Sequence, residues 1–199
     1  MVGPALLPAY LLHLHAASLY LGDYDYTLTH FIRGLNDTPF LNTLFTWITF
    51  TADLLFSVLI LGALYVAGYR KEALVAAVAM LATYGVTRGL QYLVARPRPN
   101  DLAVVQQISQ PAFPSAHTSN AFALATALSY YHRKAAPYLF AWASLIAFSR
   151  VFLGFHYFTD LLGGAAVGIV MSLIITRAAK RYDAQLSQFV ERFPRRATA

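Results

Sequence analysis

The sequence predicts an all-α protein, a polytopic bundle of helices that crosses a membrane. The composition is the first reason: of 199 residues, 58% are hydrophobic and 12% are charged, which lies outside the range of ordinary soluble domains. The second reason is the distribution, because the apolar residues form long, nearly uncharged runs joined by very short polar links. Consecutive membrane helices have this pattern.

Five apolar runs each predict a helix. Each is slightly shorter than the roughly 20 residues that cross a bilayer, and each can extend into polar sequence at one end. A buried core helix would explain any single run, but five in succession favour membrane spans. The runs cover residues 54–69, 73–95, 118–131, 135–149 and 161–176.

The first fifty residues give a weaker signal. Residues 2–22 are uncharged but contain two prolines and two histidines. They lack a basic segment and a cleavage site, so a retained first helix is favoured over a removable signal peptide. Residues 23–52 mix aromatic and charged side chains and predict interfacial or amphipathic structure. We therefore expect six transmembrane helices, or five if residues 2–22 do not span.

The whole chain, 1–199, is expected to form one membrane-embedded domain with its core at about 53–176 and a basic cytoplasmic tail at 177–199. Cysteine is absent, which excludes a disulfide framework, a thiol nucleophile and a thiolate metal site. The net charge of +6 comes from short clusters at the ends of apolar runs. Such clusters are typical of charges that set membrane topology and argue against nucleic-acid binding.

These basic clusters predict the orientation. They lie at alternate helix junctions, near residues 70–71, 133–134 and 177–181, and the positive-inside rule places all three in the cytoplasm. The two other junctions, at 96–114 and 150–160, then lie on the extracytoplasmic side of the cell membrane. Nearly all the polar residues that could take part in catalysis fall in these outer segments.

The outer segments carry groups that suit a phosphate. Arg98 and Arg150 each carry a permanently charged, planar guanidinium group that can donate paired hydrogen bonds to phosphate oxygens. Ser115 follows a proline at a predicted helix start, where backbone N–H groups and the helix dipole favour an anion. Inserting an ionisable residue into a membrane costs about 2.5–3.5 kcal/mol, so a cluster of such residues indicates a shared function.

Two histidines and an aspartate could provide the chemistry. His156 and Asp160 are spaced i, i+4, so on one helix face the carboxylate can fix the imidazole tautomer. The free nitrogen of His156 could then attack phosphorus, and His117 could protonate the departing oxygen. The same three side chains could instead bind a metal, but the neighbouring arginines would repel a divalent cation. We expect neither a metal nor another cofactor.

The three segments resemble the signature of the type 2 phosphatidic acid phosphatase superfamily, which includes bacterial membrane lipid phosphatases, glucose-6-phosphatase and vanadium-dependent haloperoxidases. That signature is Lys, six residues, Arg-Pro; then Pro-Ser-Gly-His; then Ser-Arg, five residues, His, three residues, Asp. The stretch from Ser149 to Asp160 matches the third segment in full. The resemblance covers about residues 53–175.

The resemblance implies a metal-independent membrane phosphatase that works through a phosphohistidine. It assigns the nucleophile to His156, the carboxylate that orients it to Asp160, and the acid for the leaving group to His117. The phosphate-binding residues that it implies are Arg98, Ser115 and Arg150. The implied substrate is a membrane lipid phosphate, such as undecaprenyl pyrophosphate, phosphatidylglycerol phosphate, phosphatidic acid or a lipid A phosphate, with polyprenyl pyrophosphate favoured. A lipid phosphotransferase of the same family and a non-enzymatic transporter are the alternatives. The haloperoxidase relatives are soluble and much longer.

Two positions depart from the signature. Ala116 replaces the glycine, a change between small residues that a helix start accepts unless the backbone needs a positive φ. Gln91 replaces the lysine and brings no charge, although it can still donate a hydrogen bond to phosphate. The spacing of residues 88, 91, 95 and 98 predicts one helix face. We hypothesise that Arg88, or less favourably Arg96, replaces part of the missing charge; the alternative is that Arg88 only extends to the membrane interface.

Three further residues receive structural interpretations. Asp53 precedes an apolar run and is expected to cap its helix. Gly164 and Gly168 have the spacing that permits close packing of two helices.

Overall fold

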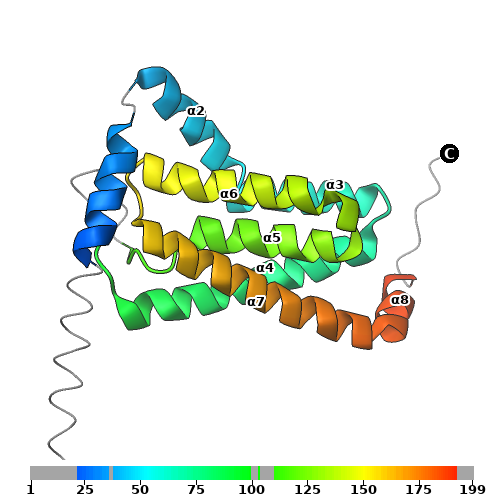
Figure 1. The fold of residues 1–199 in the computed structure, drawn as a ribbon. Coiled ribbons are helices and arrows are strands. Elements are labelled where there is room, and N and C mark those ends of the chain that lie inside the picture. The colour runs from blue at the N-terminus through cyan, green and yellow to red at the C-terminus, as the bar shows by residue number, and fades with distance from the viewer. Residues whose placement is uncertain (1–21, 36–37, 100–102, 104–109, 192–199) are drawn as a thin grey trace, which may run out of the picture.

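The computed structural model describes residues 22–35, 38–99, 103 and 110–191, and these residues are helical wherever they have regular structure. A helix at 22–34 comes first and is blue in Figure 1. The helices that follow are α2 (Pro39–Phe50), α3 (Leu54–Val66), α4 (Arg70–Val94), α5 (Ala116–Tyr131), the 3₁₀ turn η1 (Arg133–Ala135), α6 (Ala136–Phe152), α7 (Phe158–Arg181) and α8 (Asp183–Glu191). All five helices predicted from apolar runs are therefore present, and the all-α prediction is confirmed.

Helix α5 forms the centre of the bundle. It packs against α4, α6 and α7, while α3 lies beside α4 (Figure 1). Its alanines at 121, 123, 125 and 127 are almost completely buried, so the neighbouring helices approach it closely. A Cβ atom on Gly164 would lie 2.8 Å from the Ser115 carbonyl oxygen, and one on Gly168 would collide with the backbone of Ser119. The predicted close packing at these two glycines is confirmed.

The described residues contain fewer candidate membrane spans than the six expected for the whole chain. Three described segments are long and apolar enough to cross a membrane: α4, η1 with α6, and α7. Helices α2 and α3 qualify as a pair, but a bend of 50° separates them, which gives up to four spans. Helix α5 has only 16 residues. The expected span at residues 2–22 lies outside the described residues except for Gly22, so the count of six is not confirmed.

The helix junctions gather at two opposite ends of the bundle. At one end the rings of Tyr69 and His132 are 5.4 Å apart and Lys71 pairs with Asp183, so the predicted basic clusters lie near one another. At the other end, where the blue helix lies (Figure 1), the segments after α4, before α5 and between α6 and α7 contact one another. The three polar segments singled out from the sequence thus share one end.

Candidate active site

The segment after α4 brings two arginines to this end. Helix α4 ends at Val94, and Ala95 takes the left-handed conformation with φ 49°, which turns the chain out of the helix. Arg98 therefore lies beyond α4, and the predicted single helix face holds only for residues 88 and 91. The Arg98 guanidinium donates to the carbonyl oxygens of Gln110 (2.8 Å) and Phe155 (2.9 Å).

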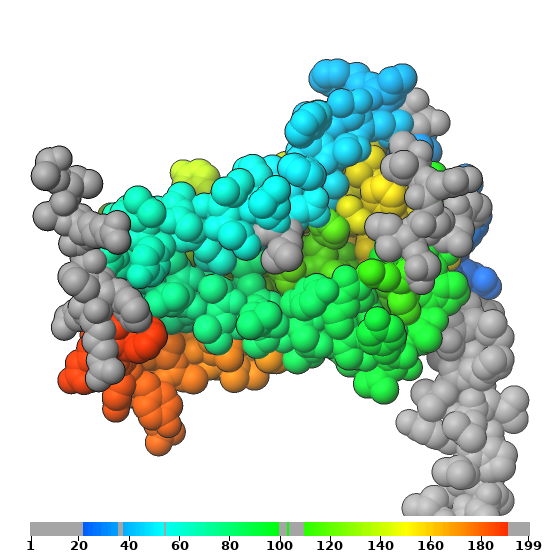
Figure 2. Space-filling view, turned by 180° about the vertical axis from the view of Figure 1, so that it is seen from behind, coloured from blue at the N-terminus to red at the C-terminus, as the bar shows by residue number. Residues whose placement is uncertain are grey.

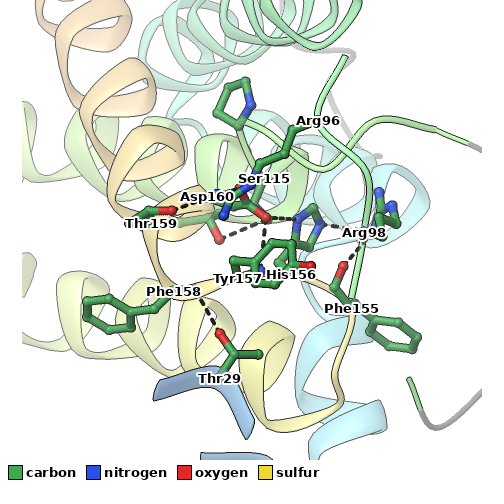
Figure 3. Close-up of polar contacts among 12 residues, drawn as sticks. Thr29, Arg96, Arg98, Ser115, Phe155, His156, Tyr157, Phe158, Thr159 and Asp160 are labelled. Carbon is green, nitrogen blue, oxygen red and sulfur yellow. Dashed lines mark hydrogen bonds and ion pairs between the residues drawn. The ribbon is translucent and has the colours of Figure 1, made fainter. Parts of the chain in front are cut away.

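His156 lies next to Arg98 and is 1% exposed. Its Nε2 is 3.2 Å from Arg98 Nη1, and its Nδ1 is 3.3 Å from Asp160 Oδ2 (Figure 3). Both contacts fit a neutral ring that donates from Nδ1 to the carboxylate and offers the Nε2 lone pair. The sequence predicted that His156 and Asp160 share a helix face, but His156 precedes α7. Asp160 Oδ2 instead caps the helix by accepting the Tyr157 N–H at 2.9 Å.

The surroundings of His156 keep its ring neutral. Burial lowers the pKa of His156 well below the ordinary value of 6.5, and the positive charges of Arg98 and Arg150 lower it further. His117 acts in the same direction. A neutral imidazole with a free nitrogen is the form that can act as a nucleophile.

This lowered pKa predicts an unusual pH profile. Because a nucleophilic His156 must be unprotonated, a lower pKa extends its reactive form to more acidic solutions. We expect the acid limb of kcat/KM to have its midpoint below pH 6.5. The measurement is kcat/KM against pH, corrected for the second ionisation of the substrate phosphate at about pH 6. A midpoint of the acid limb above pH 6.5, after this correction, would contradict the lowered pKa of His156.

Asp160 is held in turn by a network that reaches the first helix. Its second oxygen accepts from Arg96 Nη1 at 2.8 Å, and Arg96 Nη2 donates to Asp25 Oδ2 at 2.7 Å. Asp25 also accepts the Thr159 N–H at 3.0 Å. Arg96 is thus neutralised by two carboxylates (Figure 3 shows its contact with Asp160), which argues against Arg96 as the substitute for the signature lysine.

His117, at the start of α5, has a carboxylate partner of its own. Its Nε2 is 2.7 Å from Asp53 Oδ1. Asp53 occupies the N-cap position of α3, yet its side chain makes no capping hydrogen bond. The prediction that Asp53 caps its helix was therefore wrong, because the bend between α2 and α3 directs the carboxylate to His117 instead.

Arg150 and Ser115 are two more buried polar residues at this end of the bundle. Arg150 is 4% exposed, donates from Nη1 to Thr49 Oγ1 at 3.0 Å, and lies 4.5 Å from the Phe155 ring centroid. Ser115 is fully buried, and its hydroxyl accepts from Thr118 Oγ1 at 3.1 Å. Ala116 is the first residue of α5 and does not have a positive φ, so the backbone there does not require the glycine of the signature.

Gln91 and Arg88 form a connected pair on α4. Gln91 is 2% exposed, and its Nε2 donates to the Pro114 carbonyl oxygen at 2.9 Å. Its Oε1 accepts from Arg88 Nη1, also at 2.9 Å, and Arg88 contacts Gln110 as well. Arg88 is close enough to Arg98 for their charges to repel. The Gln91 amide thus donates a hydrogen bond to the segment before α5 and accepts one from Arg88.

The arginines at this end differ in how they are neutralised. Arg96 has two carboxylate partners, whereas neither Arg98 nor Arg150 forms an ion pair among the residues that the structure describes. The charges of both act on His156 and on His117, so these four side chains share one electrostatic environment. Within the described ranges, no group of three or more acidic, histidine or cysteine residues could hold a metal ion. This arrangement places two cations without carboxylate partners beside a buried neutral imidazole, and it can receive an anion.

Sequence reasoning missed Asp25 and Asp53 as parts of this site. Each is more than 60 residues from the side chain that it binds, so no local spacing connects them. The available signal was an acidic residue in a largely apolar stretch, which is costly unless it has a partner.

Comparison with known proteins identifies relatives. The family model described as PAP2 superfamily matches residues 72–183. Phosphatidylglycerophosphatase B of Bacillus subtilis is 30% identical over 55% of this chain, and the match spans 59% of that protein. Undecaprenyl-diphosphatase BcrC of the same organism is 27% identical over 77% of this chain and 83% of its own length.

A solved structure shares the fold. The crystal structure of a transmembrane PAP2-type phosphatidylglycerolphosphate phosphatase from Bacillus subtilis superposes with a TM-score of 0.71, covering 95% of this chain and 100% of that one at 24% identity. This likeness supports a helical membrane bundle. The named relatives are all phosphatases, which supports the prediction of a phosphoric ester hydrolase.

Proposed function

The chain belongs to the PAP2 superfamily, and we propose that it is an integral membrane phosphatase that removes phosphate from a membrane lipid through a phosphohistidine at His156. One observation supports this most strongly: Arg98 and Arg150 have no carboxylate partner among the described residues and both act on the same buried imidazole. Guanidinium groups left in this state suit the oxygens of a phosphate.

The reaction uses the chain's own groups. Nε2 of His156 attacks phosphorus while Asp160 holds the Nδ1 proton and stabilises the positive ring that forms. Arg98 and Arg150, with Ser115, bind the phosphoryl oxygens and stabilise the charge of the transition state. The bond to the leaving oxygen breaks, and His117 protonates that oxygen. Water then attacks the phosphohistidine with His117 as the base.

A groove beside the site suits a lipid chain. A hollow of about 340 Å³ opens between α3 and α4 (cyan and green in Figure 2). Ser57 and Asn120 lie in this groove, one helical turn further along their helices than Asp53 and His117. A hydrocarbon chain in the groove would place its phosphate at the site. Its lining includes Ser57, Val58, Leu61, Met80, Tyr84 and Asn120.

Polyprenyl pyrophosphate is the favoured substrate, because the match to the undecaprenyl-diphosphatase extends over more of this chain than the match to the phosphatidylglycerophosphatase. The basic clusters at the opposite end of the bundle support an extracytoplasmic site in the cell membrane.

The test is phosphate release by purified protein in detergent. Undecaprenyl pyrophosphate, phosphatidylglycerol phosphate, phosphatidic acid and a lipid A phosphate would be compared, each with EDTA and with orthovanadate. We expect release that survives EDTA and is blocked by vanadate, fastest with the pyrophosphate. Release that requires a divalent metal, or no release from any of the four lipids, would reject the proposal.

Arg88 is proposed to supply the charge that Gln91 lacks. A hydrogen bond to a charged group contributes roughly 1.5–3 kcal/mol, so Arg88→Ala should lower kcat/KM by roughly 10- to 100-fold, less than Arg98→Ala. Gln91→Lys in the Arg88→Ala background should recover part of the loss, since it restores a cation one turn away. Full turnover in Arg88→Ala, measured beside an inactive Arg98→Ala, would contradict this role.

A further inference from the structure

Asp53 stands outside the three signature segments, yet its carboxylate contacts one of the predicted catalytic groups. It follows the bend between α2 and α3, and Oδ1 lies 2.7 Å from Nε2 of His117. The carboxylate makes no capping bond to its own helix. We propose that Asp53 is a positioning residue that fixes which nitrogen of His117 exchanges a proton with the substrate, an inference that rests on the proposed phosphatase function.

The contact with Asp53 determines which nitrogen of His117 can exchange a proton with the substrate. With the Nε2 proton donated to Asp53, Nδ1 is the nitrogen available to the substrate. In the first step Nε2 of His156 forms its bond to phosphorus, the bond from phosphorus to the leaving oxygen breaks with its electron pair on that oxygen, and the Nδ1 proton of the His117 imidazolium moves to it. In the second step water attacks phosphorus, the bond between phosphorus and Nε2 of His156 breaks, and the water gives a proton to Nδ1 of His117. The Nε2 proton stays with Asp53 throughout, so the imidazole returns to its starting state.

The charges around His117 make this carboxylate necessary. Burial and the charges of Arg150 and Arg98 oppose a positive charge on His117, and Asp53 offsets part of their effect. The other nearby carboxylate, Asp160, is engaged by His156 and Arg96. Among the described residues, Asp53 is thus the carboxylate placed to favour the protonated form of His117 against the two arginines.

The test uses the leaving group. An alkyl phosphate such as phosphatidic acid must leave as an alkoxide and needs the proton, whereas p-nitrophenyl phosphate leaves as a stable phenolate. General acid catalysis contributes roughly 10²–10⁴-fold, so Asp53→Asn should lower kcat/KM, which reports formation of the phosphohistidine, at least about 100-fold with the alkyl ester and less than about tenfold with the aryl ester. Asp23→Asn, an exposed aspartate changed in the same way, is the matched control and should leave both rates unchanged.

A double-mutant cycle separates positioning from folding. If Asp53 acts through His117, adding Asp53→Asn to His117→Ala should cause little further loss. Equal losses with both esters, or losses that multiply in the double variant, would mean that Asp53 has a general structural role and would overturn the inference. A wild-type protein that hydrolyses neither ester, nor any of the four lipids, would instead reject the proposed function itself.

Discussion

His156→Ala is expected to abolish turnover, with a loss of kcat near the roughly 10⁶-fold seen when other covalent hydrolases lose their nucleophile. The imidazole is almost completely buried between Asp160 and Arg98, so no neighbouring side chain can take its place without moving. The phosphoenzyme should disappear as well. Substrate carrying a labelled phosphoryl group, quenched in alkali because phosphohistidine is labile in acid, measures both effects.

Two histidine variants provide the controls. His132 is exposed at the far end of α5, and His132→Ala should retain wild-type turnover and labelling. His117→Ala, assayed with p-nitrophenyl phosphate, should still form the phosphoenzyme and should accumulate it, because the water step loses its base. Labelled protein in His156→Ala would place the nucleophile at another residue.

Much of the fold could be predicted because membrane helices leave a strong local signal. The apolar runs at 54–69, 73–95 and 161–176 each fall on a helix, and the basic clusters at alternate junctions correctly predicted which segments meet at each end. The spacing from Ser149 to Asp160 likewise brought out a set of residues that the structure places close together.

The rest depended on tertiary structure. The apolar run at 73–95 marked the end of α4 well, but the predicted helix face extended the helix to residue 98, because no glycine or proline before residue 97 indicated the left-handed turn at Ala95. The i, i+4 spacing of His156 and Asp160 suggested a helix face, although the pair actually spans a helix cap. The partners Asp25 and Asp53 come from the aromatic-rich segment before α3, whose mixed composition gives no clear period.

The second large effect is expected at Arg150, which, unlike Arg96, has no carboxylate partner among the described residues. Arg150→Met is expected to lower kcat by roughly 10³-fold, within the range for losing a cation that stabilises a phosphoryl transition state. The same change should raise the melting temperature of the ligand-free protein. A buried guanidinium without a carboxylate is costly, and among the described residues Arg150 Nε has no hydrogen-bond partner; methionine fills a similar space without charge. Thermal unfolding in detergent measures the stability.

Arg96→Met is the matched comparison and should behave in the opposite way. Its removal leaves Asp25 and Asp160 buried without their cation, so the melting temperature should fall. Orthovanadate should stabilise the wild-type protein, by about 2.7 kcal/mol at 100 times its dissociation constant, and should have little effect on Arg150→Met. This contrast follows from charge alone: a cation that already has its anion stabilises the fold, and one without an anion stabilises the bound phosphate. If Arg150→Met lowered stability as much as Arg96→Met and kept its response to vanadate, Arg150 would be a structural residue and the phosphate would have to bind elsewhere.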